Sequence, residues 1–276
     1  MSKVEKALQK AKTMEATAPG LASTLSESDL ALSGTEIKTY GHDIRKMGEP
    51  WKLSISDLAE TRIIYPGMSE PRVAEAFRAI RTSVVKACRA AHNCVVLVTS
   101  LSDNGGASFV ARNLTAAFAF DESRTALLVD CRLSEPAHQY LVSSQTQFGL
   151  TDYLESDTVQ IDEIVHPVGI PRFRLVPAGR RSMLSTEYLD SQKMRDLIGH
   201  LKTRYPDRYI VLDVSAIGSS PDARVLADVS DVVLLVVPFG RATESEIWNA
   251  AKSIDEDKFL GVVFNDQPSL PLSARG

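Results

Sequence analysis

Residues 95–109 have the sequence VVLVTSLSDNGGASF, in which an apolar run leads into a short polar loop with two glycines. The run at residues 95–99 predicts a buried strand, and the pattern over residues 109–118 predicts the start of a helix. A strand, a glycine-rich turn and a helix in this order are typical of a phosphate-binding loop (P-loop), whose backbone N–H groups surround the phosphates. A P-loop ends in Gly-Lys followed by Ser or Thr, whereas this loop ends in Gly106, Ala107 and Ser108. The sequence therefore predicts a phosphate-binding scaffold that lacks its lysine.

The composition restricts the class of protein. With 276 residues, of which 44% are hydrophobic, the chain can bury the core of one large domain, alone or with an extension. The formal net charge of -4 argues against a general nucleic-acid-binding protein, which is usually basic. The sequence has no apolar stretch near the roughly 18–20 residues that cross a bilayer, and its N-terminus lacks a signal-peptide core. We therefore expect a cytoplasmic protein with no nucleic-acid partner.

The chain contains three cysteines, Cys88, Cys94 and Cys131. Their number is odd, and their spacing matches no metal-binding pattern. In a reducing compartment such cysteines are usually free thiols. We therefore expect all three to be buried and free, and to form neither disulfides nor a metal site.

The chain divides unevenly along its length. Residues 1–14 carry apolar side chains at helical spacing and predict a short amphipathic helix. This helix could dock on a partner or cover its own domain, and the sequence leaves both readings open. Residues 15–50 are rich in Ser, Thr, Gly and Ala and predict a flexible linker. An ordered domain is expected over residues 51–276, with its compact part beginning at about residue 70.

Further apolar runs follow the first predicted strand, and most are separated by helical patterns. The predicted strands lie at residues 125–130, 174–177, 209–213, 232–237 and 261–265, and a long helix is predicted at residues 73–91. Continuous apolar strands alternating with helices indicate an α/β fold with a mostly parallel sheet covered on both faces. Ligands of such sheets bind beyond the carboxyl ends of the strands. The loop after Thr99, Asp130 and Asp213 fall at these ends, so we expect them to converge.

Several short segments occur in an order typical of one protein family. They are EAFRAIR at residues 75–81, VTS at 98–100, NL at 113–114, LLVD at 127–130, VPAGRR at 176–181 and TEYLDSQKM at 186–194. This ordered set resembles the bacterial tyrosine autokinases (BY-kinases) of exopolysaccharide and capsule synthesis, a branch of the P-loop ATPases related to MinD and ParA. The resemblance covers about residues 60–266 and implies a P-loop NTPase-like fold. The opening SKVEKAL at residues 2–8 is similar to kinases encoded with exosortase-linked polysaccharide loci.

The resemblance implies a site for ATP or ADP with Mg²⁺. The positions that match the family's nucleotide-binding residues are Asn104, Gly105, Gly106, Ala107, Ser108, Phe109, Arg132 and Asn265. Ser108 and Asp213 match its metal-binding positions, and Asp130 and Asp213 are the remaining catalytic candidates. Asp213 would orient metal-bound water, and Asn265 would lie near the nucleotide base. Asp213 and Asn265 could also serve only as caps of their strands, and this alternative stays open.

The departures from the family pattern fall on catalytic positions. Ala107 replaces the lysine that neutralises the phosphates, a contact typically worth about 1.5–3 kcal/mol in binding and more in a phosphoryl-transfer transition state. The family's second motif, Asp-x-Asp-x-Arg-x-Pro, here has Arg132 for its second Asp and Ser134 for its Arg. Arg132, or Arg112 one turn into the helix, could replace the missing cation. The tyrosine cluster expected near the C-terminus is missing, since the last tyrosine is Tyr209.

Assembly residues are retained. Glu75, Arg78 and Arg81 match the family's E-x-x-R-x-x-R subunit-contact motif, and their spacing places them along one helix face. The resemblance implies a homo- or hetero-oligomer formed through this face. Without the resemblance, the same charges would indicate an ordinary solvated helix face.

Three functional hypotheses follow. The first is a catalytically impaired kinase homologue that regulates or scaffolds polysaccharide synthesis and export, with an active BY-kinase or a polysaccharide co-polymerase (chain-length) protein as partner. Such a partner would recruit it to the inner face of the plasma membrane, and it could bind no nucleotide. The second is a weakly active tyrosine kinase or ATPase that uses Arg132 or Arg112. The third, a ParA/MinD-like positioning ATPase, is disfavoured because the helix at residues 73–91 matches the kinases.

Overall fold

The computed structural model describes residues 51–88, 93–143, 148–204 and 207–267. The predicted N-terminal helix and linker, residues 1–50, lie outside this part of the chain. Within it, no helix is both long and apolar enough to cross a membrane.

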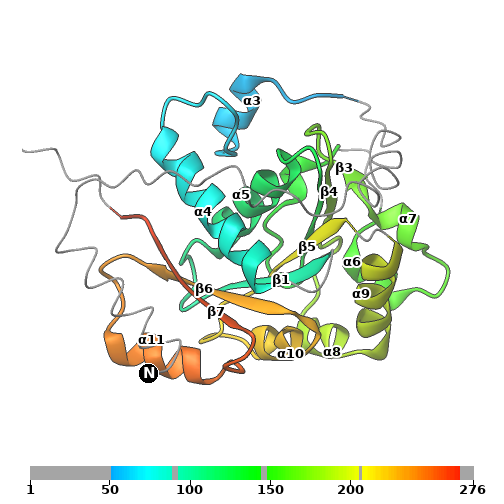
Figure 1. Cartoon of the computed structure of the whole chain (residues 1–276). Helices are drawn as coiled ribbons and strands as arrows, with labels where there is room; N and C mark the ends of the chain where they lie inside the picture. The colour runs from blue at the N-terminus through cyan, green and yellow to red at the C-terminus, as the bar shows by residue number, and fades with distance from the viewer. Residues whose placement is uncertain (1–50, 89–92, 144–147, 205–206, 268–276) are drawn as a thin grey trace, which may run out of the picture.

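A seven-stranded sheet forms the centre of the molecule (Figure 1), in the order β3-β4-β2-β5-β1-β6-β7. The strands are β1 Cys94–Ser100, β2 Thr125–Asp130, β3 His166–Pro167, β4 Phe173–Val176, β5 Arg208–Asp213, β6 Val232–Pro238 and β7 Phe259–Asn265. Every neighbouring pair is parallel except β3 and β4. The predicted α/β fold with a mostly parallel sheet is therefore confirmed, and the two-residue antiparallel edge strand β3 is an addition that the sequence analysis missed.

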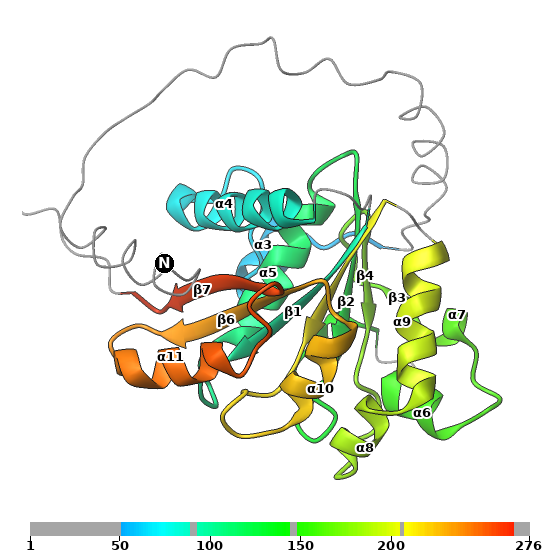
Figure 2. The same ribbon diagram turned by 60° about the horizontal axis from the view of Figure 1, so that its bottom comes forward.

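Helices cover both faces of the sheet (Figure 2). They are α3 Ile55–Glu60, α4 Pro71–Ala87, α5 Ala107–Ala119, α6 Leu150–Glu155, α7 Ile161–Ile164, α8 Ser185–Leu189, α9 Gln192–Arg204, α10 Asp222–Val229 and α11 Glu244–Lys252. Side chains alternate between the faces along β1 because the strand period is two. Val96 and Val98 join the core cluster that contains residues of α3, α4 and α5, whereas Val95 and Leu97 join the cluster with α9, α10 and α11.

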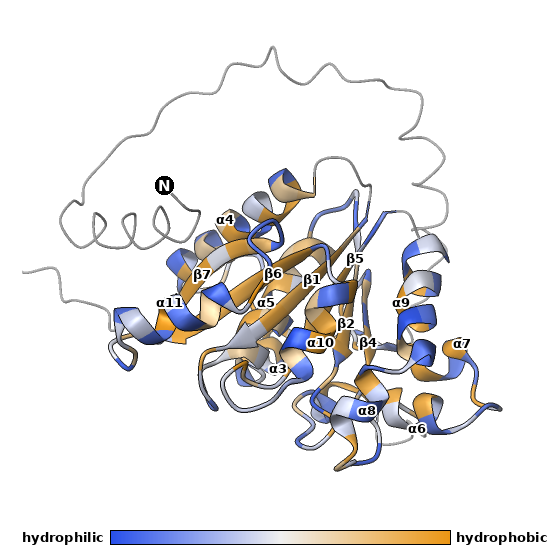
Figure 3. Cartoon of the chain, turned by 90° about the horizontal axis from the view of Figure 1, so that it is seen from below, coloured by the Kyte–Doolittle hydropathy of each residue, from blue (hydrophilic) through white to orange (hydrophobic). Residues whose placement is uncertain are grey.

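The central strands are buried along their whole length, which explains their continuous apolar sequences. Each residue of β1, β2, β5 and β6 is buried, and Figure 3 shows these strands as the most hydrophobic part of the interior. The predicted strands agree with the observed ones to within two residues at each end. The predicted helix at residues 73–91 instead covers Pro71–Ala87, because Cys88 already leaves the helical conformation.

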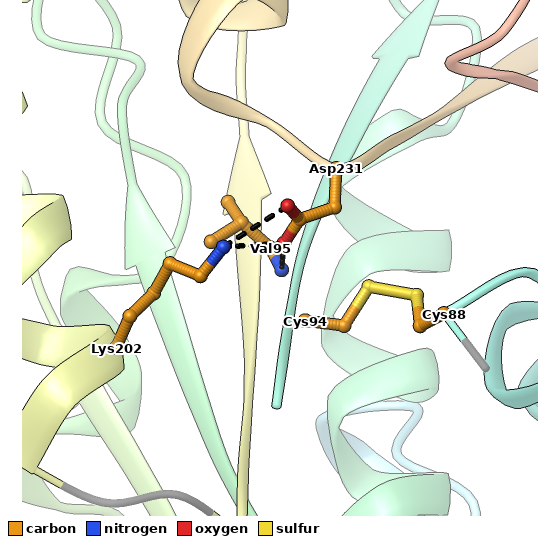
Figure 4. The surroundings of a disulfide bond; sticks show 5 residues. All are labelled: Cys88, Cys94, Val95, Lys202 and Asp231. Carbon is orange, nitrogen blue, oxygen red and sulfur yellow. Dashed lines mark hydrogen bonds and ion pairs between the residues drawn. A yellow bond between two sulfur atoms is a disulfide. The ribbon is translucent and has the colours of Figure 1, made fainter. Parts of the chain in front are cut away.

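The prediction that all three cysteines are free is wrong for two of them. Cys88, the C-terminal cap of α4, and Cys94, the first residue of β1, are joined by a disulfide (Figure 4). The return of the chain from α4 into β1 brings their Cα atoms to 6.1 Å, within the range that a disulfide requires. Counting cysteines could not reveal this proximity. Cys131 is free and buried, as predicted.

The start of β1 is also held from its other side (Figure 4). The backbone N–H of Val95 donates to Asp231 Oδ2 at 2.7 Å, and Lys202 Nζ lies 2.9 Å from the same oxygen. These contacts tie β1 to the C-terminal part of α9 and to the start of β6. The strand that leads into the glycine-rich loop is thus anchored at its far end.

Candidate functional site

The glycine-rich loop joins the end of β1 to the start of α5. Gly106 caps α5 with a φ of 94°, and Asn104 has a φ of 58°, so both adopt left-handed conformations. A Cβ atom on Gly106 would lie 2.1 Å from Nδ2 of Asn265, and one on Gly105 would lie 2.7 Å from Cβ of Ser100. The two glycines are therefore required by close packing of the loop against Asn265 and the end of β1.

A cavity of about 360 Å³ opens on this loop. It is lined by Ser100, Asn104, Gly105, Gly106, Ala107, Ser108, Arg132, Glu135, Pro136 and Ala137. Six of the eight predicted cofactor-binding residues belong to this lining. Phe109 instead packs edge-on against Phe77, and Asn265 lies behind the loop, with its Nδ2 donating to the Gly105 carbonyl at 3.5 Å.

Two features of the lining could attract an anion, namely the N-terminus of a helix and one arginine. The first N–H groups of α5, a helix of 13 residues, have no partner within the helix, and its dipole favours negative charge there. Ala107, at the lysine position of a P-loop, is 3% exposed and contributes only a methyl group. Nη2 of Arg132 lies 2.7 Å from Oε2 of Glu135, and Nε donates to the Glu135 carbonyl. The cation at the cavity is thus paired with a neighbouring carboxylate.

Arg112, the other predicted substitute cation, lies elsewhere. It is 8% exposed, and its guanidinium lies over the rings of Phe109 and Tyr140 at 5.9 and 5.8 Å. Burial lowers the pKa of Arg112, an effect that Tyr140 and Asp213 partly oppose. Arg112 is absent from the lining of the cavity. Its position favours a packing role for this side chain.

The two predicted strand-end carboxylates lie side by side, as the strand pattern predicts. Asp130 and Asp213 are paired in the β2–β5 ladder, and both are fully buried. Oδ2 of Asp130 accepts the backbone N–H groups of Ala137 and His138 at 2.8 and 2.9 Å, and Oδ1 accepts that of Arg132 at 3.2 Å. Burial raises the pKa of Asp130, His138 lowers it and Asp213 raises it further.

His138 is the residue that the sequence analysis missed. Its Nε2 forms a 2.8 Å hydrogen bond with Oδ2 of Asp213, and both side chains have no exposed surface. The same residue binds Asp130 through its backbone N–H. No spacing rule connects a histidine with a carboxylate 75 residues further along the chain, so the sequence held no signal for this pair.

Two further aspartates have local structural partners. Asp222 is buried and accepts hydrogen bonds from the hydroxyls of Ser185 and Thr186, which connects α10 with α8. Asp103, in the glycine-rich loop, accepts a hydrogen bond from Ser219 at 2.9 Å. The negative charge of Asp103 is therefore directed toward the loop after β5.

The predicted assembly residues on α4 differ in their surroundings. Glu75 and Arg78 are exposed. Arg81 is half-buried, donates to the Ala117 carbonyl at 3.0 Å and lies 3.8 Å from Asp121. Arg81 thus connects α4 with the end of α5 in its own domain. Of the three predicted assembly residues, only Glu75 and Arg78 are exposed charged residues.

Sequence comparison finds relatives of this chain among bacterial tyrosine kinases. No protein-family model matches the chain. It is 26% identical over 208 residues to the tyrosine-protein kinase Wzc of Salmonella typhimurium, covering 75% of this chain and 28% of Wzc. It is 27% identical over 194 residues to the tyrosine-protein kinase CpsD of Streptococcus agalactiae, covering 69% of this chain and 81% of CpsD. The homologues of this chain are bacterial tyrosine kinases.

The solved structures show the same fold. The kinase domain of the Escherichia coli tyrosine kinase ETK superposes with a TM-score of 0.66 at 22% identity, covering 81% of this chain and 92% of that domain. The cell-division ATPase MinD of Pyrococcus furiosus has a TM-score of 0.52 at 20% identity, covering 62% of this chain and 71% of MinD. The resemblance inferred from the motifs is therefore confirmed for the fold and for the homologues. The chain spans about a quarter of the length of Wzc but most of CpsD.

Proposed function

We propose that this chain is a tyrosine-kinase-like protein of exopolysaccharide synthesis or export that acts by binding its partners and no longer transfers phosphate. The observation that carries the proposal is Ala107, a buried residue of the cavity lining that stands at the position of the P-loop lysine. Phosphoryl transfer depends almost entirely on positioning and on stabilising charge that develops on the phosphoryl oxygens. A methyl group supplies neither a charge nor a hydrogen bond for that purpose.

The second motif supports the same proposal. Arg132 stands where the kinases carry an aspartate, and Asp130 already accepts three backbone N–H groups. A carboxylate held in this way orders the loop at residues 131–138. We propose that Asp130 is retained for the fold of this loop and that catalysis no longer uses it.

The cavity remains suited to the phosphates of ATP or ADP. Its volume, the N-terminus of α5 and Arg132 fit a polyphosphate chain. P-loop and kinase homologues imply a nucleotide with Mg²⁺. We propose that the nucleotide is a ligand that stabilises the domain and that it is not turned over.

We further propose that the partner is an active tyrosine kinase or a polysaccharide co-polymerase, which would hold the chain at the inner face of the plasma membrane. Glu75 and Arg78, exposed on α4, are the contact residues, and Arg81 holds the helix in place. Reversing both charges in Glu75→Arg/Arg78→Glu should release the partner from the tagged full-length chain in a pull-down. Glu187→Arg, an exposed position on α8, is the control and should retain it. Recovery of no kinase, co-polymerase or other polysaccharide-synthesis component with the unaltered chain would contradict the proposal.

A second candidate function is an active kinase or slow ATPase in which Arg132 replaces the lysine. It is favoured by the position of Arg132 in the same cavity lining as Ser108. Transfer of labelled phosphate from ATP to the chain or to a partner, abolished in Arg132→Ala, would replace our first proposal with this one. Arg195→Ala is the matched control, because Arg195 also pairs with a nearby carboxylate, that of Asp190, but lies on α9.

A further inference from the structure

The two carboxylates that the kinase pattern assigns to the metal and to catalysis are both engaged within the protein. Both oxygens of Asp130 accept backbone N–H groups, at distances from 2.8 to 3.2 Å. Oδ2 of Asp213 is bound to His138. Neither aspartate has exposed surface, and neither belongs to the lining of the cavity.

Asp213 has one carboxylate oxygen that His138 does not bind. Among the described residues, Oδ1 of Asp213 has no hydrogen-bond partner, and neither has Nδ1 of His138. An unpaired carboxylate oxygen could accept a hydrogen bond from metal-bound water. Both unpaired atoms, however, belong to side chains without exposed surface. Asp213 is also absent from the lining of the cavity, so in this structure Oδ1 does not face a metal ion held there.

The residues that line the cavity offer Mg²⁺ no free carboxylate. Ser108 could supply a hydroxyl oxygen, but Glu135, the one acidic residue in the lining, is paired with Arg132. Mg²⁺ requires octahedral oxygen coordination and is usually held by one or two carboxylates besides phosphates and water. In the part of the chain that the structure describes, no group of three or more His, Cys, Asp or Glu residues is arranged to hold a metal ion. The residues present therefore do not fit the Mg²⁺ that the P-loop pattern implies.

We infer that the cavity binds a nucleoside polyphosphate as the free anion, without a divalent cation, and that Arg132 neutralises it. The inference rests on the proposed nucleotide site and states how that site works. Arg132 is already at the cavity, and its partner Glu135 is 71% exposed. An ion pair with one exposed member is weak, so a phosphate group can replace Glu135 as the partner of Arg132. The N–H groups at the start of α5 bind the same anion.

Calorimetry with ADP tests the inference directly. The full chain is titrated in EDTA and in excess MgCl₂ at matched ionic strength, since salt screens the same charges. We expect the two dissociation constants to agree within about twofold, and Arg132→Ala to weaken binding by about tenfold or more, the usual effect of losing a charge-assisted hydrogen bond. Arg195→Ala removes a similar arginine–aspartate pair far along the chain on α9 and should bind as the unaltered protein does.

Three results would overturn the inference. In the first, Mg²⁺ strengthens ADP binding by about tenfold or more, and Asp213→Asn returns the affinity to its metal-free value. In the second, Arg132→Ala leaves ADP binding unchanged. In the third, ADP does not bind under either condition. The partner pull-down is a separate measurement. Failure of the metal-free site therefore leaves the proposed scaffolding function standing, and failure of the pull-down leaves the metal-free site standing.

Discussion

The imidazole of His138 and the carboxylate of Asp213 lie 2.8 Å apart, and neither side chain has exposed surface. Asp213 ends β5, whereas His138 lies on the loop that follows β2. The pair therefore closes that loop over the carboxyl edge of the sheet. Asp213, which the kinase pattern would use at the nucleotide site, does not belong to the lining of the cavity.

We expect loss of this pair to destabilise the domain strongly. His138→Ala leaves a buried carboxylate without its partner, which should lower the free energy of unfolding by about 2–4 kcal/mol. Urea denaturation measures the change. The matched control is Arg241→Ala, which breaks the exposed ion pair with Asp266 and should have little effect. Equal effects of the two variants would contradict a stabilising role for the buried pair.

Gly106 should tolerate no side chain. In Gly106→Ala the new Cβ meets Nδ2 of Asn265 in a left-handed conformation, so the free energy of unfolding should fall by about 1–3 kcal/mol and ADP binding should weaken. Gly67 has a similar φ of 82° with no atom within 4 Å, so Gly67→Ala measures the backbone strain alone. Adding Asn265→Ala to Gly106→Ala should recover part of the loss. Thermal denaturation of all four proteins checks this, and no recovery in the double variant would exclude the steric explanation.

Arg112 should prove structural and Arg132 functional. Arg112→Ala removes a buried guanidinium from the rings of Phe109 and Tyr140, which should cost about 1–3 kcal/mol of stability. Its affinity for ADP should change by less than about twofold, because Arg112 does not line the cavity. Denaturation should show the larger loss of stability in Arg112→Ala, whereas calorimetry should show the larger loss of ADP affinity in Arg132→Ala. A large loss of ADP affinity in a folded Arg112→Ala protein would identify Arg112 as the replacement cation.

The cysteines can be checked by counting thiols. Burial raises the pKa of the Cys131 thiol, and the negative charges of Asp130, Asp213 and Asp222 raise it further. The thiol should therefore stay neutral and should not react in the native protein at pH 8. Unfolding without reductant should expose one thiol, and unfolding with reductant should expose all three. Unfolded Cys88→Ser should show two thiols without reductant. Three thiols in the unreduced wild-type chain would show that the disulfide is absent.

Much of the fold could be predicted because local sequence and burial agree in the centre of the sheet. Strands such as β1 and β6 are buried on both faces, so each carries a continuous apolar run that needs no knowledge of its neighbours. The edge strand β3 could not be predicted in this way. β3 has only two residues, His166 and Pro167, and forms only because β4 lies beside it. A strand of that length leaves no periodic signal.

The candidate site also has some parts that could be predicted from the sequence and others that could not. Gly105, Gly106 and Ser108 could be assigned from sequence, because a turn between a strand and a helix requires small residues at fixed spacing. The choice between Arg112 and Arg132 could not be made from the sequence, because the sequence allows either cation to reach the loop. Only the packed structure shows that the Arg112 guanidinium lies over two aromatic rings and that Arg132 lines the cavity.

The sequence by itself determined the α/β architecture, the position of the glycine-rich loop and the absence of a lysine from it. These properties depend on residues close together in the chain, through strand and helix periodicity and the conformational freedom of glycine. Tertiary structure decided which groups meet. The bonding of His138 to Asp213, the joining of Cys88 to Cys94 and the placement of Arg132 at the cavity depend on how loops pack over the sheet. Side chains distant in sequence become neighbours only when the core brings their backbones together.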